Sequence, residues 1–262
     1  MRKRVQIGLN GLLVGAVGLV VWQVLRVREP TYHGKPLSVW VEEYDKNFLS
    51  PDNPTRERAK RAICQIGTNA LPILLEWAAA KDSVLKKKVM AFAKKQSLVK
   101  IRFRSDEYYH ARSDAGFSAL GPMAKPAVPA LIELLNRGDY AVRVAAAYDL
   151  MWIGPEAEEA VPVLVRCLSD SNNLVCFRAT RCLAHIHMKP ELVVPALVQS
   201  LGQARVPERE TIAAMIAFGV QAKPAVPNLL RLLEDKNSMI WPYAAHALKQ
   251  IDPQAAAKAG VE

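Results

Sequence analysis

A proline returns at a nearly constant interval in the second half of this chain, and that interval constrains the fold more than any other feature. The prolines stand 33, 33 and 32 residues apart, each directly after a valine: Pro129, Pro162, Pro195 and Pro227. Eight residues ahead of each proline runs a second column, which is mostly glycine: Gly121, Gly154, His187 and Gly219. A fixed period of this length predicts stacked helical hairpins, because one such hairpin cannot bury its apolar face alone.

The residues before the glycine column predict the first helix of each hairpin. The position directly before it is apolar in every repeat: Ile66, Leu120, Ile153, Ile186, Phe218 and Ile251. Three residues earlier a second apolar column follows: Ile63, Phe117, Leu150, Leu183, Met215 and Leu248. Four residues earlier again stands a short side chain: Ala59, Ser113, Ala146, Ala179, Thr211 and Ala244. These spacings form one buried helical stripe, with short residues where the neighbouring helix approaches most closely.

The two columns also predict where the helices end and begin. Glycine tolerates the left-handed conformation that commonly ends a helix, and proline fits the first turn of the next one. Leucines such as Leu131, Leu134 and Leu135 then form the buried side of the second helix. We therefore predict an all-α solenoid of about five hairpins, with a final lone helix at about Trp241 to Ile251 and negligible strand.

The segment Ala141 to Asp170 resembles HEAT repeats, specifically the short bacterial kind also found in phycobilisome lyases. The resemblance covers about Thr55 to the C-terminus. It implies a HEAT-like α-solenoid whose second helices line a concave contact face. Because a repeat fold hosts many functions, a bilin-lyase-like enzyme remains one alternative. Tyr32 to Tyr44, together with the apolar N-terminus, is similar to uncharacterised HEAT-repeat proteins of planctomycete and verrucomicrobial bacteria.

The N-terminus predicts a membrane anchor. A basic tail, residues 1–4, precedes an apolar run at 5–27 that would span roughly 35 Å as a helix, enough to cross a bilayer. A cleaved signal peptide is the alternative, but between Gly18 and Gly34 no small residue offers a cleavage site. The charge asymmetry predicts a single-pass inner-membrane protein with a cytoplasmic N-terminus and a periplasmic or extracellular solenoid.

Four glycines in the apolar run share one helical face: Gly8, Gly11, Gly15 and Gly18. Small residues at such spacings let two helices approach closely in lipid, which suggests a homodimer. The alternative is that glycine is simply common in membrane spans.

Residues 28–54 are predicted to form a linker and a capping helix, ahead of repeats at 55–262. Pro36 stands at the start of the helix, and its apolar stripe comprises Leu37, Trp40, Val41, Tyr44 and Phe48. The ends of a solenoid need such a cap, so we interpret Trp40 as a core residue.

No catalytic or metal-binding motif stands out in the sequence. The four cysteines lack CxxC spacing, no phosphate loop follows a strand, and no nucleophile comes with a matching base. Cys182 and His185 are three residues apart on one predicted helix, but a metal would need further ligands that the sequence does not supply. We therefore expect no catalytic residue, no metal and no cofactor.

The predicted second helices carry one polar position per repeat, four residues after the helix-starting proline: Glu133, Arg166, Gln199 and Arg231. The flanking positions are apolar, so these side chains should face solvent on the concave face. Their variation suggests a surface shaped for one unknown protein partner, the alternative being a merely solvated face. The mixed signs argue against a nucleic-acid groove.

An insertion at 81–104 concentrates the charge of the protein. Nine basic residues against the single acid Asp82 give +8, most of the net charge of +10. Such a segment attracts anionic lipid or another polyanion, unless it only aids solubility. The candidate residues are Lys86, Lys87, Lys88, Lys94, Lys95, Lys100, Arg102 and Arg104.

These observations together predict a non-enzymatic, membrane-anchored scaffold that mediates protein–protein interaction at the cell envelope. The alternatives are a basic-surface binder of anionic lipid or nucleic acid, and the bilin-lyase-like enzyme.

Overall fold

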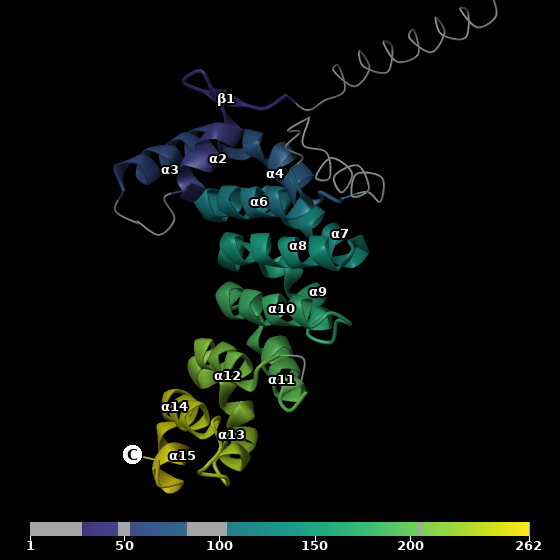
Figure 1. The fold of residues 1–262 in the computed structure, drawn as a ribbon. Helices are drawn as coiled ribbons and strands as arrows, with labels where there is room; N and C mark the ends of the chain where they lie inside the picture. The colour runs from purple at the N-terminus through teal and green to yellow at the C-terminus, as the bar shows by residue number, and fades with distance from the viewer. Residues whose placement is uncertain (1–27, 47–52, 83–103, 204–205, 262) are drawn as a thin grey trace, which may run out of the picture.

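The protein folds as an all-α solenoid, seen in a computed structural model that describes residues 28–46, 53–82, 104–203 and 206–261 (Figure 1). The cap and first hairpin comprise β1 (Thr31–Tyr32), β2 (Lys35–Pro36), α2 (Leu37–Lys46), α3 (Pro54–Ile66) and α4 (Leu71–Ala78). The following hairpins comprise α6 (Asp106–Leu120), α7 (Val128–Arg137), α8 (Tyr140–Ile153), α9 (Val161–Cys167), α10 (Asn173–Ile186), α11 (Pro190–Ser200), α12 (Glu208–Ala217), α13 (Val226–Leu232), α14 (Trp241–Ile251) and α15 (Pro253–Lys258).

The helices form two layers that run the length of the stack. First helices α6, α8 and α10 lie one above another, and the second helices of these hairpins follow beside them (Figure 1). The strand pair β1–β2 lies at one end of the stack and α15 at the other. One expectation is wrong: α14 is not a lone last helix, because α15 packs against it and buries Ala256.

The glycine column closes the first helices as the period predicts. Gly121 and Gly154 have φ values of 55° and 71°, and their N–H groups bond to the carbonyls of Phe117 and Leu150. A short 3-10 segment follows each glycine and leads into the Val-Pro start of the second helix. His187 occupies the glycine position of the fourth hairpin with φ 54°, a strained conformation for a non-glycine residue.

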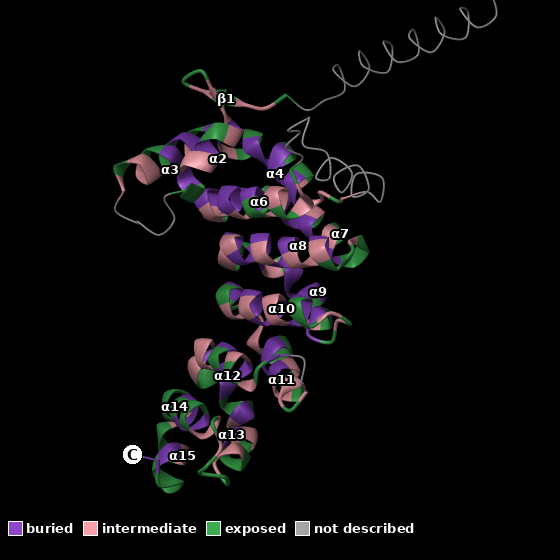
Figure 2. Ribbon diagram, viewed as in Figure 1, coloured by how far each residue is buried: buried purple, intermediate pink, exposed green. Residues whose placement is uncertain are grey.

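One continuous core runs between the stacked hairpins, and its residues belong to the columns defined above. The short-residue column is fully buried at Ala59, Ala146, Ala179 and Ala244. The buried residues, purple in Figure 2, lie where neighbouring helices face each other. Because hairpins pack mainly against their neighbours in the stack, the core extends along it.

The segment before the repeats covers the first hairpin. Helix α2 packs on α3 and α6, with Leu37 and Val41 fully buried and Trp40 and Tyr44 nearly so. The indole N–H of Trp40 donates to the carbonyl of Tyr32 at 3.1 Å, which ties the β1–β2 hairpin to α2. Phe48, the last residue of the predicted stripe, lies outside the described residues.

Within the described ranges, no helix has the length and apolar character needed to cross a bilayer. The predicted anchor at 5–27, its glycine face, and residues 83–103 of the insertion all lie outside those ranges. The anchor, the dimer contact and the polyanion site therefore stay predictions, and only Arg104 of the polyanion set is described.

Candidate functional site

The second helices place one polar side chain per hairpin on their outer surface. Glu133, Arg166, Gln199 and Arg231 are all exposed, one each on α7, α9, α11 and α13. In α7 the cause is visible, because Val128, Leu131 and Leu135 turn inward and leave Glu133 on the opposite side. We call this surface the second-helix face.

Neighbouring hairpins meet on this face through side chains. Arg166 Nη2 donates to Asn136 Oδ1 at 3.2 Å, which links α9 to α7. Glu133 pairs instead within α7, with Arg137 Nε at 3.1 Å. The side chains of Gln199 and Arg231 make no hydrogen bond or ion pair with any other described residue. The face thus offers two engaged and two free polar groups to a partner.

A shallow hollow of about 250 Å³ opens beside Arg166. Its walls come from α7, α8, α9 and the loop after α9: Leu135, Asn136, Arg143, Val163, Arg166, Cys167 and Asp170. The Cys167 thiol is mostly buried, and this burial raises its pKa to about 11. A thiol with such a pKa is a poor nucleophile, so Cys167 is not activated for chemistry at neutral pH.

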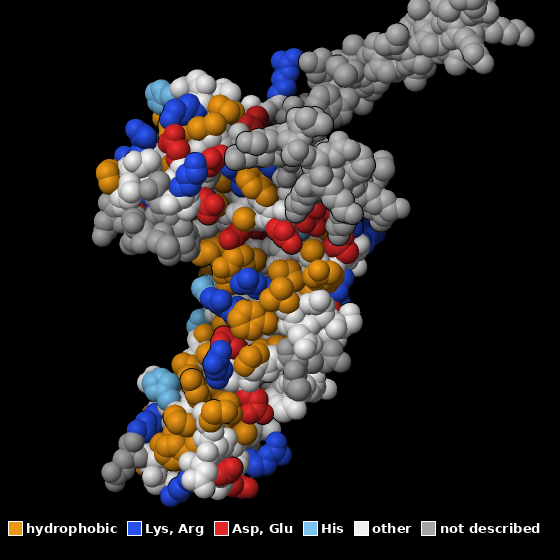
Figure 3. Space-filling view, in the orientation of Figure 1, with side chains coloured by type: hydrophobic (Ala, Val, Ile, Leu, Met, Phe, Trp, Pro, Cys, Tyr) orange, Lys and Arg blue, Asp and Glu red, His pale blue; other side chains and the backbone are white. Residues whose placement is uncertain are grey.

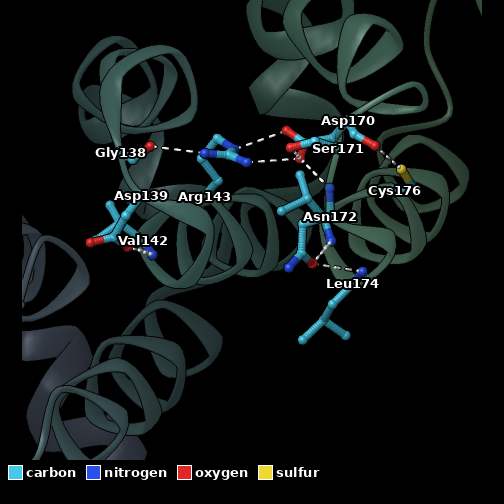
Figure 4. A network of polar contacts seen from close by, with 10 residues as sticks. Gly138, Asp139, Val142, Arg143, Asp170, Ser171, Asn172, Leu174 and Cys176 are labelled. Atoms are coloured by element: carbon cyan, nitrogen blue, oxygen red, sulfur yellow. Dashed lines mark hydrogen bonds and ion pairs between the residues drawn. The ribbon is translucent and has the colours of Figure 1, made fainter.

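A network of polar contacts fixes the loops at the edge of the hollow (Figure 4). Arg143 donates from Nε and Nη2 to both carboxylate oxygens of Asp170, at 2.9 and 2.8 Å, and from Nη1 to the Gly138 carbonyl at 3.0 Å. Burial opposes ionisation of Asp170, but hydrogen bonds from Arg143 and the Asn172 N–H outweigh it and lower its pKa. This two-pronged pair holds one inter-hairpin loop against the next.

The same network caps two helices. Asp139 Oδ1 accepts from the Val142 N–H at the start of α8, and Asn172 Oδ1 accepts from the Leu174 N–H at the start of α10. The caps satisfy N–H groups that a helix start leaves without partners. These caps fix where α8 and α10 begin. Since α7 and α9 directly precede them in the chain, the caps also help to fix the distance between the second helices.

A larger cleft of about 760 Å³ lies between the capping segment, α4 and α6. Its lining combines aromatic rings with charged groups: Arg28, Glu29, Ser38, Ile73, Glu76, Trp77, Ala80, Lys81, Arg104, Tyr108, Tyr109 and Arg112. Arg104 stacks over the Tyr108 ring, with Cζ 4.7 Å from its centroid. The sequence did not reveal this cleft, because its walls come from three segments that only the fold brings together.

Arg112 anchors the wall of this cleft. Its side chain is buried, donating from Nη1 to the Ser38 carbonyl at 2.6 Å and pairing through Nη2 with Glu42 at 2.5 Å. Hydrogen bonds from Lys46 and Arg112 lower the pKa of Glu42 to about 2. These bonds join α6 to the cap, so Arg112 is committed to structure and not available to a ligand.

The sequence also did not reveal two acids on α6 and α8, the fully buried Asp149 and the half-buried Asp114. Ser113 Oγ lies 2.7 Å from Asp149 Oδ2 and 3.1 Å from the Leu74 carbonyl oxygen. A hydroxyl has one hydrogen and cannot donate to both oxygens at once; when Asp149 is protonated, it can donate to Ser113 and leave the Ser113 hydrogen to Leu74. Burial raises the pKa of Asp149 well above its usual value, in agreement with a neutral acid.

Asp114 lies near Asp149 and accepts a hydrogen bond from the Trp152 indole N–H. Burial raises the pKa of Asp114 to about 6, against the lowering effect of that bond and of Arg178. The one sequence signal was the position of Ser113 in a column that is otherwise mostly alanine. Asp149 and the Ser113 hydroxyl that it contacts are both fully buried, so the pair lies in the core and not on a surface open to substrate.

The described ranges contain no group of three or more His, Cys, Asp or Glu side chains that could hold a metal ion. Cys182 is fully buried, and burial raises the pKa of its thiol well above the usual value. His185 is exposed, and desolvation followed by the charge of Arg181 lowers its pKa. The pair that shares one helix therefore has no third ligand in the described part of the chain.

Comparison with known proteins agrees with this architecture. The family model for HEAT repeats matches residues 97–184 and 128–217. This part of the chain resembles HEAT repeats. No curated protein matches the chain, and the narrower resemblance to planctomycete and verrucomicrobial proteins is not tested by these matches.

The chain also matches solved structures at low sequence identity. Two engineered proteins of the Northeast Structural Genomics Consortium share 23% and 25% identity, with TM-scores of 0.43 and 0.44. The first match covers 84% of this chain and 97% of the other, and the second covers 86% and 61%. A designed armadillo repeat protein in complex with the peptide (KR)4 shares 18% identity, covering 86% of this chain and 99% of its own, with a TM-score of 0.44.

Proposed function

We propose that this chain is a non-catalytic scaffold that binds a partner protein along the second-helix face. The observation that carries the proposal is the exposed polar residue that each hairpin presents there, different in chemistry from one hairpin to the next. Glu133, Arg166, Gln199 and Arg231 offer an acid, two guanidinium groups and an amide. Such a row can be complementary to one partner and not to others.

The rigidity of the face supports this proposal. Helical backbones satisfy their own hydrogen bonds, so recognition on such a surface rests on side chains that project from fixed positions. Arg143 and Asp170 hold adjacent loops together, and Arg166 bridges to Asn136 across two helices. A surface that is already ordered loses less conformational entropy when a partner binds.

The state of the cysteines favours binding over catalysis. Burial raises the pKa of the thiols of Cys167 and Cys182, which disfavours the nucleophilic thiolate. The neutral Asp149 is closed off from solvent between α6 and α8. These groups serve the core, which supports a scaffold and gives no basis for a bilin-lyase-like reaction.

We extend the proposal to a membrane anchor at residues 5–27, on the sequence alone. The apolar run follows Arg2, Lys3 and Arg4, which favours a cytoplasmic N-terminus and a solenoid outside the inner membrane. A reporter enzyme that is active only outside the cytoplasm, fused after residue 262, should be active. A silent reporter with a stable fusion protein would reverse the topology.

Site-specific photo-crosslinking tests the face itself. A benzoylphenylalanine at Gln199 or at Arg231 should give the same crosslinked partner band in cells, since both positions lie on the proposed contact surface. A matched probe at Gln221, which is exposed in the 3-10 segment before α13, should give no such band. Equal crosslinking at all three positions, or at Gln221 alone, would contradict the assignment of this face.

A second candidate function rests on the basic insertion. Its charge of +8 would attract anionic lipid headgroups, and an anchor would hold it within reach of a bilayer. The structure describes only its ends, where Lys81 and Arg104 line the large cleft. This candidate is compatible with the scaffold, because the two proposals rest on different residues.

A further inference from the structure

A second surface with binding chemistry lies on first helices α8 and α10. It combines three aromatic rings with two arginines, and we call it the aromatic–arginine patch: Tyr148, Trp152, Phe177, Arg178 and Arg181. Hydrophobic and basic side chains gather over these two helices on the face shown in Figure 3. The residues of the second-helix face belong to other helices, so the two surfaces are distinct.

Arginine guanidinium groups stack against aromatic rings in this patch. Arg178 Cζ lies 4.0 Å from the centroid of the Tyr148 ring and joins α10 to α8. The Tyr148 ring meets the Trp152 ring edge-on at 5.9 Å, and Arg178 and Arg181 each lie 5.8 Å from the Phe177 ring. Rings that are held in place and half exposed can receive an apolar side chain at little entropic cost.

The guanidinium groups of Arg178 and Arg181 are not held in ion pairs within the described ranges, although the charge of Arg178 acts on Asp114. Neither Arg178 nor Arg181 has a carboxylate within 4.0 Å among the described residues, in contrast to the fully paired Arg143. Arg178 Nε is buried and has no hydrogen-bond acceptor in that part of the chain. The nearby Asp114 is engaged by the Trp152 indole N–H instead. Stacked arginines with free donors are well suited to bind carboxylates.

From this arrangement we propose that the aromatic–arginine patch binds an acidic segment of a partner protein. Carboxylates of the segment pair with Arg178 and Arg181, and its apolar side chains pack against Tyr148, Trp152 and Phe177. A nucleic acid fits less well, because it needs a basic track along its backbone. Here only two arginines are present, and the charge of one of them, Arg178, acts on the nearby Asp114.

Fluorescence anisotropy with the full-length chain tests this proposal. The probe is a fluorescein-labelled peptide of four Glu-Phe repeats, and the control probe has four Lys-Phe repeats. The acidic probe should bind saturably, the basic probe should not, and added salt should weaken binding. The double variant Arg178→Gln, Arg181→Gln should lose at least about tenfold in affinity, since it removes two charge-assisted contacts.

Two further variants separate this surface from the proposed scaffold face and from misfolding. Arg166→Gln on the second-helix face should bind the acidic probe as the unchanged chain does. Arg178→Lys keeps the charge but loses the planar stack on Tyr148. Its affinity for the acidic probe should therefore lie between that of the unchanged chain and that of the double variant. Circular dichroism melting curves should show that every variant is folded.

Three results would overturn the inference. They are no saturable binding of the acidic probe, equal binding by the double variant, and the same loss in Arg166→Gln. Tighter binding of a labelled oligothymidylate than of the acidic peptide, lost in the double variant, would assign the patch to nucleic acid instead. None of these outcomes depends on whether the second-helix face binds its own partner.

Discussion

Replacing Asp149 with asparagine should make the stability of the solenoid less dependent on pH and higher at neutral pH. In the native chain, Asp149 is fully buried, donates to Ser113 when protonated, and leaves its Oδ1 without a partner among the described residues. Burial raises its pKa well above the ordinary value of 3.8. The folded state therefore holds a proton that the unfolded state releases.

The magnitude follows from linkage. An acid whose pKa is raised on folding contributes fully below its unfolded pKa of 3.8, and that contribution is lost as pH rises towards the folded pKa. Between the two values, the free energy of unfolding falls by about 1.4 kcal/mol for each pH unit. Asparagine does not titrate, so the Asp149→Asn variant lacks this slope.

At acidic pH the order of stability should be reversed. The asparagine Nδ2 can donate to Ser113 in place of the carboxylic acid, but its second N–H finds no acceptor, at a cost of about 1 kcal/mol. The variant should therefore be less stable than the native chain below pH 3.8. The two stability curves should cross at about pH 4.5, and above it the variant should be the more stable chain.

Urea unfolding followed by far-UV circular dichroism, repeated across this pH range, measures the difference. Ser113→Ala serves as a control, because it breaks the hydrogen-bond chain to Leu74 while leaving Asp149 in place, and it should retain the pH slope. A constant difference between Asp149→Asn and the native chain at every pH would refute the neutral acid. So would a variant that is less stable throughout.

Further changes address the loops, the core, the turn and the insertion. Arg143→Ala should lower the free energy of unfolding by about 2 kcal/mol at neutral pH, because the Asp170 carboxylate loses its partner. This loss of stability should shrink as the pH falls below 3.8, the ordinary pKa of aspartate, and urea unfolding at several pH values measures it. Leu150→Ala should cost about 2–5 kcal/mol by opening a cavity in a fully buried site, whereas Leu150→Asp should abolish the cooperative unfolding of neighbouring hairpins; an unchanged transition would contradict the core assignment. His187→Gly should change the melting temperature little, because it relieves about 1 kcal/mol of left-handed strain but removes the edge-on contact with Phe218, and a large destabilisation would show that the ring contact dominates. A variant in which five lysines of the insertion become glutamine should no longer sediment with anionic vesicles at low salt, and its melting curve should be unchanged: Lys86, Lys87, Lys88, Lys94 and Lys95. If this variant still binds the vesicles, the charge of the insertion serves solubility alone.

The period of the sequence determined the helical architecture, because helix boundaries and buried stripes depend on residues close together in the chain. Gly121 and Gly154 end first helices where the column places them, and Leu150 is buried where the stripe places it. The same reasoning located the exposed position of Arg166 on its helix. It missed α15, since a six-residue helix carries too few periodic positions to be recognised.

Contacts between hairpins were decided only by the tertiary structure. The chain from Asp149 through Ser113 to Leu74 joins three hairpins, and the stack of Arg178 on Tyr148 joins two. The 33-residue period aligns equivalent positions, but these partners are not equivalent positions. Which side chains meet depends on the rotation and offset of packed helices, which the close packing of the whole core sets and no short stretch of sequence specifies.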